Sequence, residues 1–150
     1  VSRAQVVLEK LLFSVFHILV VNAAAVLFSS IAIAAIDVRA EAGKIALIFL
    51  SNFIMQLEIM AICFGISACL NKNAIGIGIG VAFGLYFLNI LANLEESIEF
   101  IGKITPFGYA NSGYIIEHGK IDVLPLVIGI VLMGLGVALA FARYTKKDIK

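Results

Sequence analysis

The stretch that decides the fold lies near the end of the chain, where residues 123–142 read VLPLVIGIVLMGLGVALAFA. A helix needs about 20 apolar residues to cross a hydrocarbon core of roughly 30 Å at ~1.5 Å per residue. Three more apolar stretches of 26, 27 and 22 residues precede it: 11–36, 45–71 and 73–94. Helices that are apolar on every side cannot all be buried in a soluble domain of this size. The sequence therefore predicts an all-α membrane protein with four transmembrane helices.

The composition indicates which classes of partner to expect, and the start of the sequence indicates that the chain belongs to a longer protein. The chain is 62% hydrophobic and 14% charged, and its net charge of +1 indicates neither nucleic acid nor an acidic soluble partner. Residue 1 is Val, and the first apolar stretch is too long for the core of a signal peptide. We therefore expect the C-terminal part of a longer protein.

The charged residues between the stretches predict the orientation. One side of the membrane would receive seven basic residues: Arg3, Lys10, Lys72, Arg143, Lys146, Lys147 and Lys150. The other side would receive four basic residues and seven acidic ones, which are Asp37, Glu41, Glu95, Glu96, Glu99, Glu117 and Asp122. Because basic residues favour the cytoplasm, we expect both ends of the chain inside, at the cell membrane. The tail 143–150 is also typical of a cationic anchor on anionic lipid.

The longest segment outside the four stretches, 95–121, is expected to be external and helical. Residues 95–104 mix apolar and acidic side chains, as in an interfacial amphipathic helix, and Thr105-Pro106 should end it. A second short helix is expected over 107–117, with Gly119 as its C-terminal cap. Asp122 should then cap the last helix, over 122–143. We predict a re-entrant or interfacial pair of short helices between the third and fourth spans.

Small residues recur at helical spacing in two of the stretches. Small residues four apart let a neighbouring backbone approach closely, as in membrane helix dimers. We expect helix packing, within the chain or with another chain, at Gly76, Gly80, Gly84, Gly134 and Ala138. Gly78 lies on an adjacent face of its helix, and Ala142 continues the pattern of Gly134 and Ala138. The string IGIGIG at 75–80 is no phosphate loop, because no Lys-Ser/Thr follows it.

Polar residues within the second stretch are the candidate functional site. Glu58 is the only full charge in the four stretches, and an ionised side chain at such a depth costs at least ~2.5–3.5 kcal/mol on insertion scales. Ser51 lies on nearly the same helix face, whereas Asn52 and Gln56 form a separate pair one turn apart. Two interpretations stay open: residues that line a pathway or respond to protons, and residues that hydrogen-bond between helices or face an aqueous cavity. His17 and Asn22 are expected to be packing residues.

No catalytic, metal or cofactor site is expected. His17 and His118 belong near opposite faces of the membrane, and neither has a Ser or Cys partner at a plausible shared depth. Cys63 and Cys69 have a spacing typical of neither a zinc site nor a thioredoxin motif, so two reduced thiols are expected. We therefore do not expect an enzyme.

The order of the short motifs resembles the C-terminal two-thirds of an ABC-2 type transporter permease. Ser2-Arg3 and a following Lys10 precede the first helix, Thr105-Pro106-Phe107 precedes the last one, and a Lys146-Lys147-Asp148-Ile149 tail ends the chain. The resemblance implies that the four helices are spans three to six. It implies that 1–10, with Ser2 and Arg3, is a cytoplasmic loop that contacts an ATPase. It also implies that 95–121 caps the translocation route outside.

The resemblance further implies a mechanism and its partners. A separate ATP-binding cassette ATPase would power export by alternating access, because this chain has no Walker motif of its own. A second permease copy, identical or not, would complete the transporter. The alternative is a membrane protein that does not transport, such as a channel subunit or an assembly scaffold. That alternative explains the glycines equally well but gives no reason for an ordered helix pair outside.

Overall fold

The computed structural model describes residues 2–36, 41–70 and 74–144, and every regular element in these ranges is a helix. Four of the helices are long: α1 (Arg3–Ala35), α2 (Ala42–Cys69), α3 (Ala74–Leu94) and α6 (Val123–Tyr144). All four are apolar enough to cross a membrane, and the shortest, at 21 residues, extends about 31 Å at ~1.5 Å per residue. Large side chains such as Phe13 and Ile75 lie mostly exposed on them. The chain is a multi-pass membrane protein, as the apolar stretches predicted.

The first helix is longer than expected. Ser2 caps it with a capping box, in which Gln5 N–H donates to Ser2 Oγ at 3.2 Å and Ser2 N–H donates to Gln5 Oε1 at 2.7 Å. Ser2 therefore caps α1, and the segment 3–10, which the resemblance places in a cytoplasmic loop, is helical. It forms the first turns of α1, because no glycine or proline interrupts residues 3–35.

The most extensive helix–helix contact among the described residues joins α2 to α6. A Cβ on Gly65 would lie 2.6 Å from the carbonyl oxygen of Gly136, and a Cβ on Gly136 would lie 2.5 Å from that of Ala61. Ala61 and Ala140 are also buried. The two backbones touch because neither helix carries a large side chain at these positions.

Two short helices and a turn connect α3 to α6. A single 3₁₀ turn, η1 (Glu96–Ile98), leads into α4 (Glu99–Ile104), which ends before Thr105-Pro106 as predicted. The second short helix, α5 (Ser112–His118), begins five residues later than expected, because the Asn111 side chain caps it by accepting from Tyr114 N–H at 3.2 Å. Residues 105–111 are a turn instead. The predicted cap at Gly119 is confirmed by its left-handed φ of 67°.

The start of α6 also follows the sequence. Leu124 N–H donates to Asp122 Oδ1 at 3.3 Å, and Pro125 lies in the first turn of the helix, where its missing N–H costs little. The polar residue and the proline together define where the last long helix begins.

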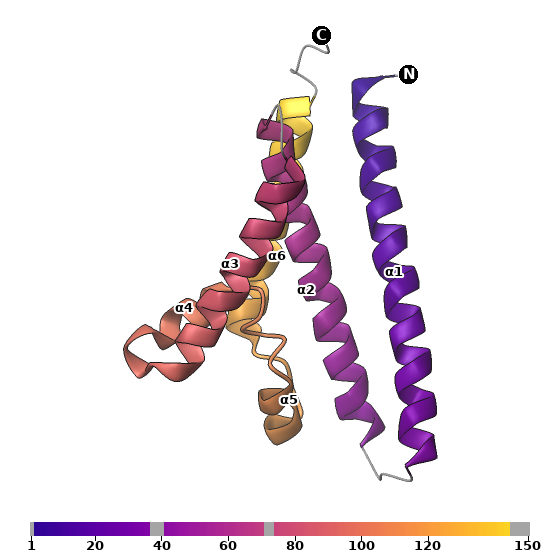
Figure 1. Cartoon of the computed structure of the whole chain (residues 1–150), viewed down its shortest axis with the longest axis vertical. Helices are drawn as coiled ribbons and strands as arrows, with labels where there is room; N and C mark the ends of the chain where they lie inside the picture. The colour runs from indigo at the N-terminus through magenta and orange to yellow at the C-terminus, as the bar shows by residue number, and fades with distance from the viewer. Residues whose placement is uncertain (1, 37–40, 71–73, 145–150) are drawn as a thin grey trace.

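Figure 1 shows α1 antiparallel to α2 on one side of the molecule, with α3 and α6 gathered on the other side of α2. The start of α1 and the end of α6 lie at the same end, and α4 and α5 lie toward the opposite end. This arrangement follows from four long helices that alternate in direction. The end that holds the start of α1 is called the terminal end below.

Candidate functional site

Glu58 and Tyr109 form a buried pair in the interior of the fold. Glu58 lies beyond the midpoint of α2, and its side chain is 1% exposed. The Tyr109 hydroxyl donates a hydrogen bond of 2.7 Å to Glu58 Oε2, and Tyr109 is equally buried. Glu58 Oε1 is buried without a hydrogen-bond partner among the described residues. A buried carboxyl oxygen without a hydrogen-bond partner lowers the stability of the fold, so Glu58 is an unusual residue at this place.

The turn 105–111 brings Tyr109 to Glu58. Thr105 Oγ1 donates to the Gly102 carbonyl at 2.9 Å, and Gly108 N–H donates to the Thr105 carbonyl at 3.0 Å. Pro106 is fully buried, and the Phe107 ring meets the edge of Tyr86 on α3 at 5.5 Å between centroids. The turn is thus fixed to α3 and α4 at its start.

The segment 105–119 runs along α2 for a considerable length. At one end Tyr109 contacts Glu58, and at the other a Cβ on Gly119 would lie 3.9 Å from Lys44 Cε. Lys44 and Glu58 are about four helical turns apart, or roughly 21 Å at ~1.5 Å per residue. A segment that only lay across the end of α2 could not make both contacts.

Gly129 on α6 makes room for the pair. A Cβ at this position would overlap the Glu58 carboxyl group and would lie 2.9 Å from Tyr109 Cε1. Three segments, from α2, the 105–111 turn and α6, therefore meet at one carboxyl group. Burial, and then the hydrogen bond to Glu58, raise the pKa of the Tyr109 phenol, so the hydroxyl stays protonated and acts as the donor.

The other polar residues predicted for the site are satisfied elsewhere. Ser51 is fully buried but donates to the Ile48 carbonyl at 2.9 Å, and Asn52 donates to the same carbonyl at 2.9 Å. Gln56 accepts from Asn22 on α1 at 2.8 Å. Asn22 is therefore a satisfied interhelical residue, as expected, whereas His17 lies exposed on α1. Of the four candidates on α2, Glu58 alone reaches Tyr109.

The predicted glycine positions lie away from contacts within the chain. A Cβ on Gly76, Gly80, Gly84 or Gly134 would meet no atom within 4 Å. On α3 it is Gly78 that faces α2, where Cys63 Sγ lies 3.6 Å from its carbonyl oxygen. Contact of Gly76, Gly80 and Gly84 with another chain stays a prediction.

The α2–α6 contact uses small residues that the sequence analysis did not single out. These residues recur at intervals of three, four or seven: Ala61, Gly65 and Ala68 on α2, and Gly129, Gly136 and Ala140 on α6. Their spacing is as regular as that of the predicted set. The spacing could therefore have identified these residues as candidates for helix packing. Spacing alone does not indicate which of several rows of small residues faces the interior of the fold.

Chemically, the Glu58–Tyr109 pair can hold a proton and fix two segments together. Among the described residues, no group of three His, Cys, Asp or Glu side chains could hold a metal ion. Comparisons with protein-family models, curated proteins and solved structures find no match to the chain.

Proposed function

We propose that this chain is the transmembrane permease subunit of an ATP-binding cassette exporter. Three features support the proposal: four apolar helices, the start of α1 and the end of α6 at one end, and the order of the Ser2-Arg3 and Thr105-Pro106-Phe107 motifs. The terminal end would face the cytoplasm, because seven of the eleven basic residues in the sequence are expected on that side of the membrane. The segment 95–121 would then be external.

The observation that carries the proposal is the contact of Tyr109 with Glu58. In the permease family that the motifs resemble, a Thr-Pro-Phe segment belongs to external helices that cap the translocation route. In this chain the residues that follow Thr105-Pro106-Phe107 reach a buried acid on a long helix. A cap joined in this way to α2 would respond when α2 moves between inward-open and outward-open states.

The partners follow from the same proposal. ATP would bind and be hydrolysed on a separate ATPase that contacts the first turn of α1, near Ser2 and Arg3. A second permease copy would complete the transporter. The exposed face of α3 at Gly76, Gly80 and Gly84 is suited to such a contact, because no side chain in the described part of the chain covers it.

The test is the identity of what co-purifies with the chain. The tagged chain would be expressed in its own host, cross-linked in native membranes and purified, and the bound proteins would be identified by mass spectrometry. We expect an ATP-binding cassette ATPase. Arg3→Glu should reduce its recovery without reducing the yield of the chain, whereas Lys103→Glu, expected on the opposite side, should not.

The alternative function, a scaffold or channel subunit that does not transport, predicts a different result. Other membrane proteins would then be recovered without an ATPase, at the same cross-linking efficiency. That outcome would contradict the permease proposal.

A further inference from the structure

Glu58 Oε1 is a buried oxygen that the described residues leave without a hydrogen bond. The side chain is almost fully buried, and Tyr109 donates only to the other oxygen, Oε2. A neutral carboxyl group in this place lacks one hydrogen bond. A carboxylate would carry a full charge with a single donor, and burial of such a charge costs far more than burial of one unpaired neutral group. The geometry therefore suits the protonated acid.

The described residues around Glu58 supply no positive charge. Residues 123–142 of α6 contain no ionisable side chain, and Arg143 lies in the last turn of that helix. On α2 the nearest ionisable residue along the chain is Cys63, which faces α3. Tyr109 is the ionisable residue that contacts the carboxyl group, and its hydroxyl is a neutral donor.

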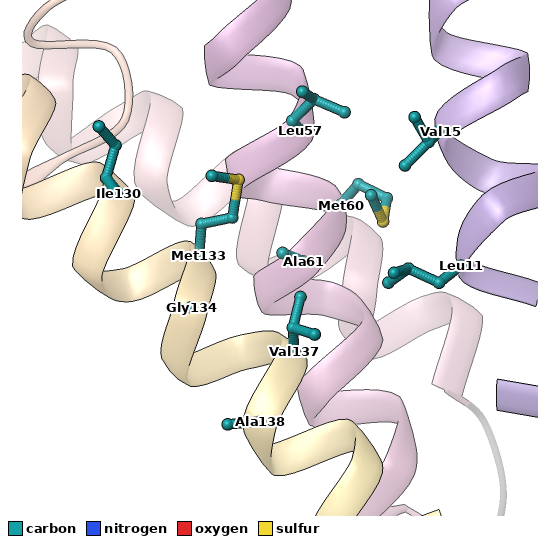
Figure 2. Close-up of a pocket in the computed structure, with 10 residues that line it drawn as sticks. All are labelled: Leu11, Val15, Leu57, Met60, Ala61, Ile130, Met133, Gly134, Val137 and Ala138. Carbon is teal, nitrogen blue, oxygen red and sulfur yellow. The ribbon is translucent and has the colours of Figure 1, made fainter. Parts of the chain in front are cut away.

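The apolar space beside Glu58 supplies no charge either. It has a volume of about 570 Å³ and lies between α1, α2 and α6, and no charged side chain lines it. Figure 2 shows Leu57 and Ile130, the chain neighbours of Glu58 and Gly129, among its lining residues. The other ionisable side chains described on α1, α3, α4 and α5 are exposed, apart from half-buried Tyr114: Arg3, Glu9, Lys10, His17, Tyr86, Lys103, Glu117 and His118.

Of the three segments that enclose the carboxyl group, the 105–111 turn is the one that does not belong to a long helix. The other two, α2 and α6, touch backbone to backbone, since a Cβ on Gly65 would lie 2.6 Å from the Gly136 carbonyl oxygen. The turn instead ends at Asn111, which is exposed. Water therefore reaches Glu58 with the least disruption of the fold when the turn moves away from α2.

We propose that Glu58 is a proton-binding site and that its proton holds the 105–111 turn against α2. In the docked state Tyr109 donates to Oε2 and the proton lies on Oε1. When the turn moves away, water enters, the proton passes to water, and the carboxylate is hydrated. Because the docked state binds one proton more than the undocked state, a rise in pH favours undocking, by up to about tenfold per pH unit. The proposal does not depend on the permease function.

Infrared spectroscopy of the purified chain in lipid nanodiscs tests for the proton. Glutamate that is isotope-labelled at its carboxyl carbon separates the C=O stretch of protonated glutamic acid from that of aspartic acid. We expect a band of protonated glutamic acid at neutral pH, where exposed glutamates are ionised. Glu58→Gln should remove this band, whereas Glu41→Gln, at an exposed residue, should leave it unchanged.

Cysteine reactivity tests the link between the proton and the turn. In a background without Cys63 and Cys69, a cysteine replaces Ala110, which is half-buried beside Tyr109. A cysteine in place of Ser112, which is exposed at the start of α5, corrects for the increase in thiolate with pH. We expect the maleimide reactivity of Ala110→Cys, relative to Ser112→Cys, to rise with pH by up to about tenfold per pH unit.

Glu58→Gln separates loss of the proton from other effects of pH. Glutamine has no proton to lose over this range and still offers Tyr109 an acceptor oxygen. In this variant the relative reactivity at position 110 should therefore stay low at every pH. If Glu58→Gln fails to fold, the unsubstituted chain still provides the test, because its infrared band should disappear over the same pH range in which the reactivity at position 110 rises.

Two results would overturn the proposal. Absence of the band at neutral pH, or a band that Glu58→Gln leaves in place, would mean that the proton is not on Glu58. A relative reactivity at position 110 that does not change with pH, or that rises equally in Glu58→Gln, would mean that the proton does not hold the turn.

Discussion

The Tyr109 hydroxyl donates a 2.7 Å hydrogen bond to Glu58 Oε2, and this bond connects the 105–111 turn to the interior of α2. The two residues are 51 positions apart in the chain. Gly129 on α6 leaves the space in which they meet. One carboxyl group thereby joins α2, the turn and α6, and substitutions at these positions should reveal whether the bond serves structure or transport.

Tyr109→Phe should destabilise the fold. The variant keeps the ring but leaves both Glu58 oxygens without a partner, at a cost of about 1–3 kcal/mol in free energy of unfolding. The measurement is unfolding of the purified protein in mixed micelles with increasing denaturing detergent. Tyr114→Phe, outside this hydrogen bond, is the control. Equal stability of Tyr109→Phe and the unsubstituted protein would mean that the bond contributes nothing.

Glu58→Gln and Glu58→Leu should behave differently from each other. Gln offers the Tyr109 hydroxyl an acceptor oxygen, so we expect near-normal yield and stability. Leu leaves the buried phenol unpaired and should cost about 1–3 kcal/mol. Normal transport by the Gln variant with a damaged Leu variant would mean a structural role. A folded Gln variant with altered transport, or an altered pH dependence of transport, would instead indicate a role in the pathway.

Gly129→Ala should destabilise the protein, although alanine generally favours a helix. The added methyl group would overlap the Glu58 carboxyl group and approach the Tyr109 ring, so the pair would have to separate. Gly134→Ala on the same helix is the matched control, because its methyl group would meet no atom within 4 Å. It should be neutral or stabilising by up to about 1 kcal/mol. Equal stability of both variants would mean that α6 does not confine the pair.

Gly80→Leu should weaken assembly without unfolding the chain. A Cβ on Gly80 would meet no atom of the described residues within 4 Å, so we expect an effect on assembly to come from a contact with a second chain. Size-exclusion chromatography and cross-linking in membranes would measure the oligomer, with Ile79→Leu as the control. If both variants assemble equally well, the stripe at Gly76, Gly80 and Gly84 faces lipid.

Cysteine labelling of intact cells should reveal the orientation. In a background without Cys63 and Cys69, a cysteine at Ser97, which is exposed just after α3, should react with an impermeant maleimide. A cysteine at Thr145, which lies outside the described residues, should react only after the membrane is opened. The opposite pattern would reverse the proposed topology and contradict the permease proposal.

Much of the fold is readable from the sequence because local chemistry determines it. Twenty or more apolar residues require a spanning helix, since a backbone in hydrocarbon must satisfy its own hydrogen bonds. Ser2, Asp122 and Gly119 define ends of helices through contacts with residues a few positions away. The same local character explains one error. The expected helix over 107–117 begins at Ser112, because its start depends on the cap at Asn111 rather than on hydrophobicity.

The sequence by itself determined that four helices cross the membrane, where most of them begin and end, and that Glu58 is exceptional. Only the tertiary structure decided what Glu58 contacts and which small residues bring helices together. Gly76 and Gly136 each belong to a regularly spaced row of small residues. Gly76 lies exposed, whereas Gly136 packs against the backbone of α2. Spacing along a helix specifies that residues share a face. Which face turns inward depends on the neighbouring helix, and Tyr109 is brought to Glu58 by a turn far away in the sequence.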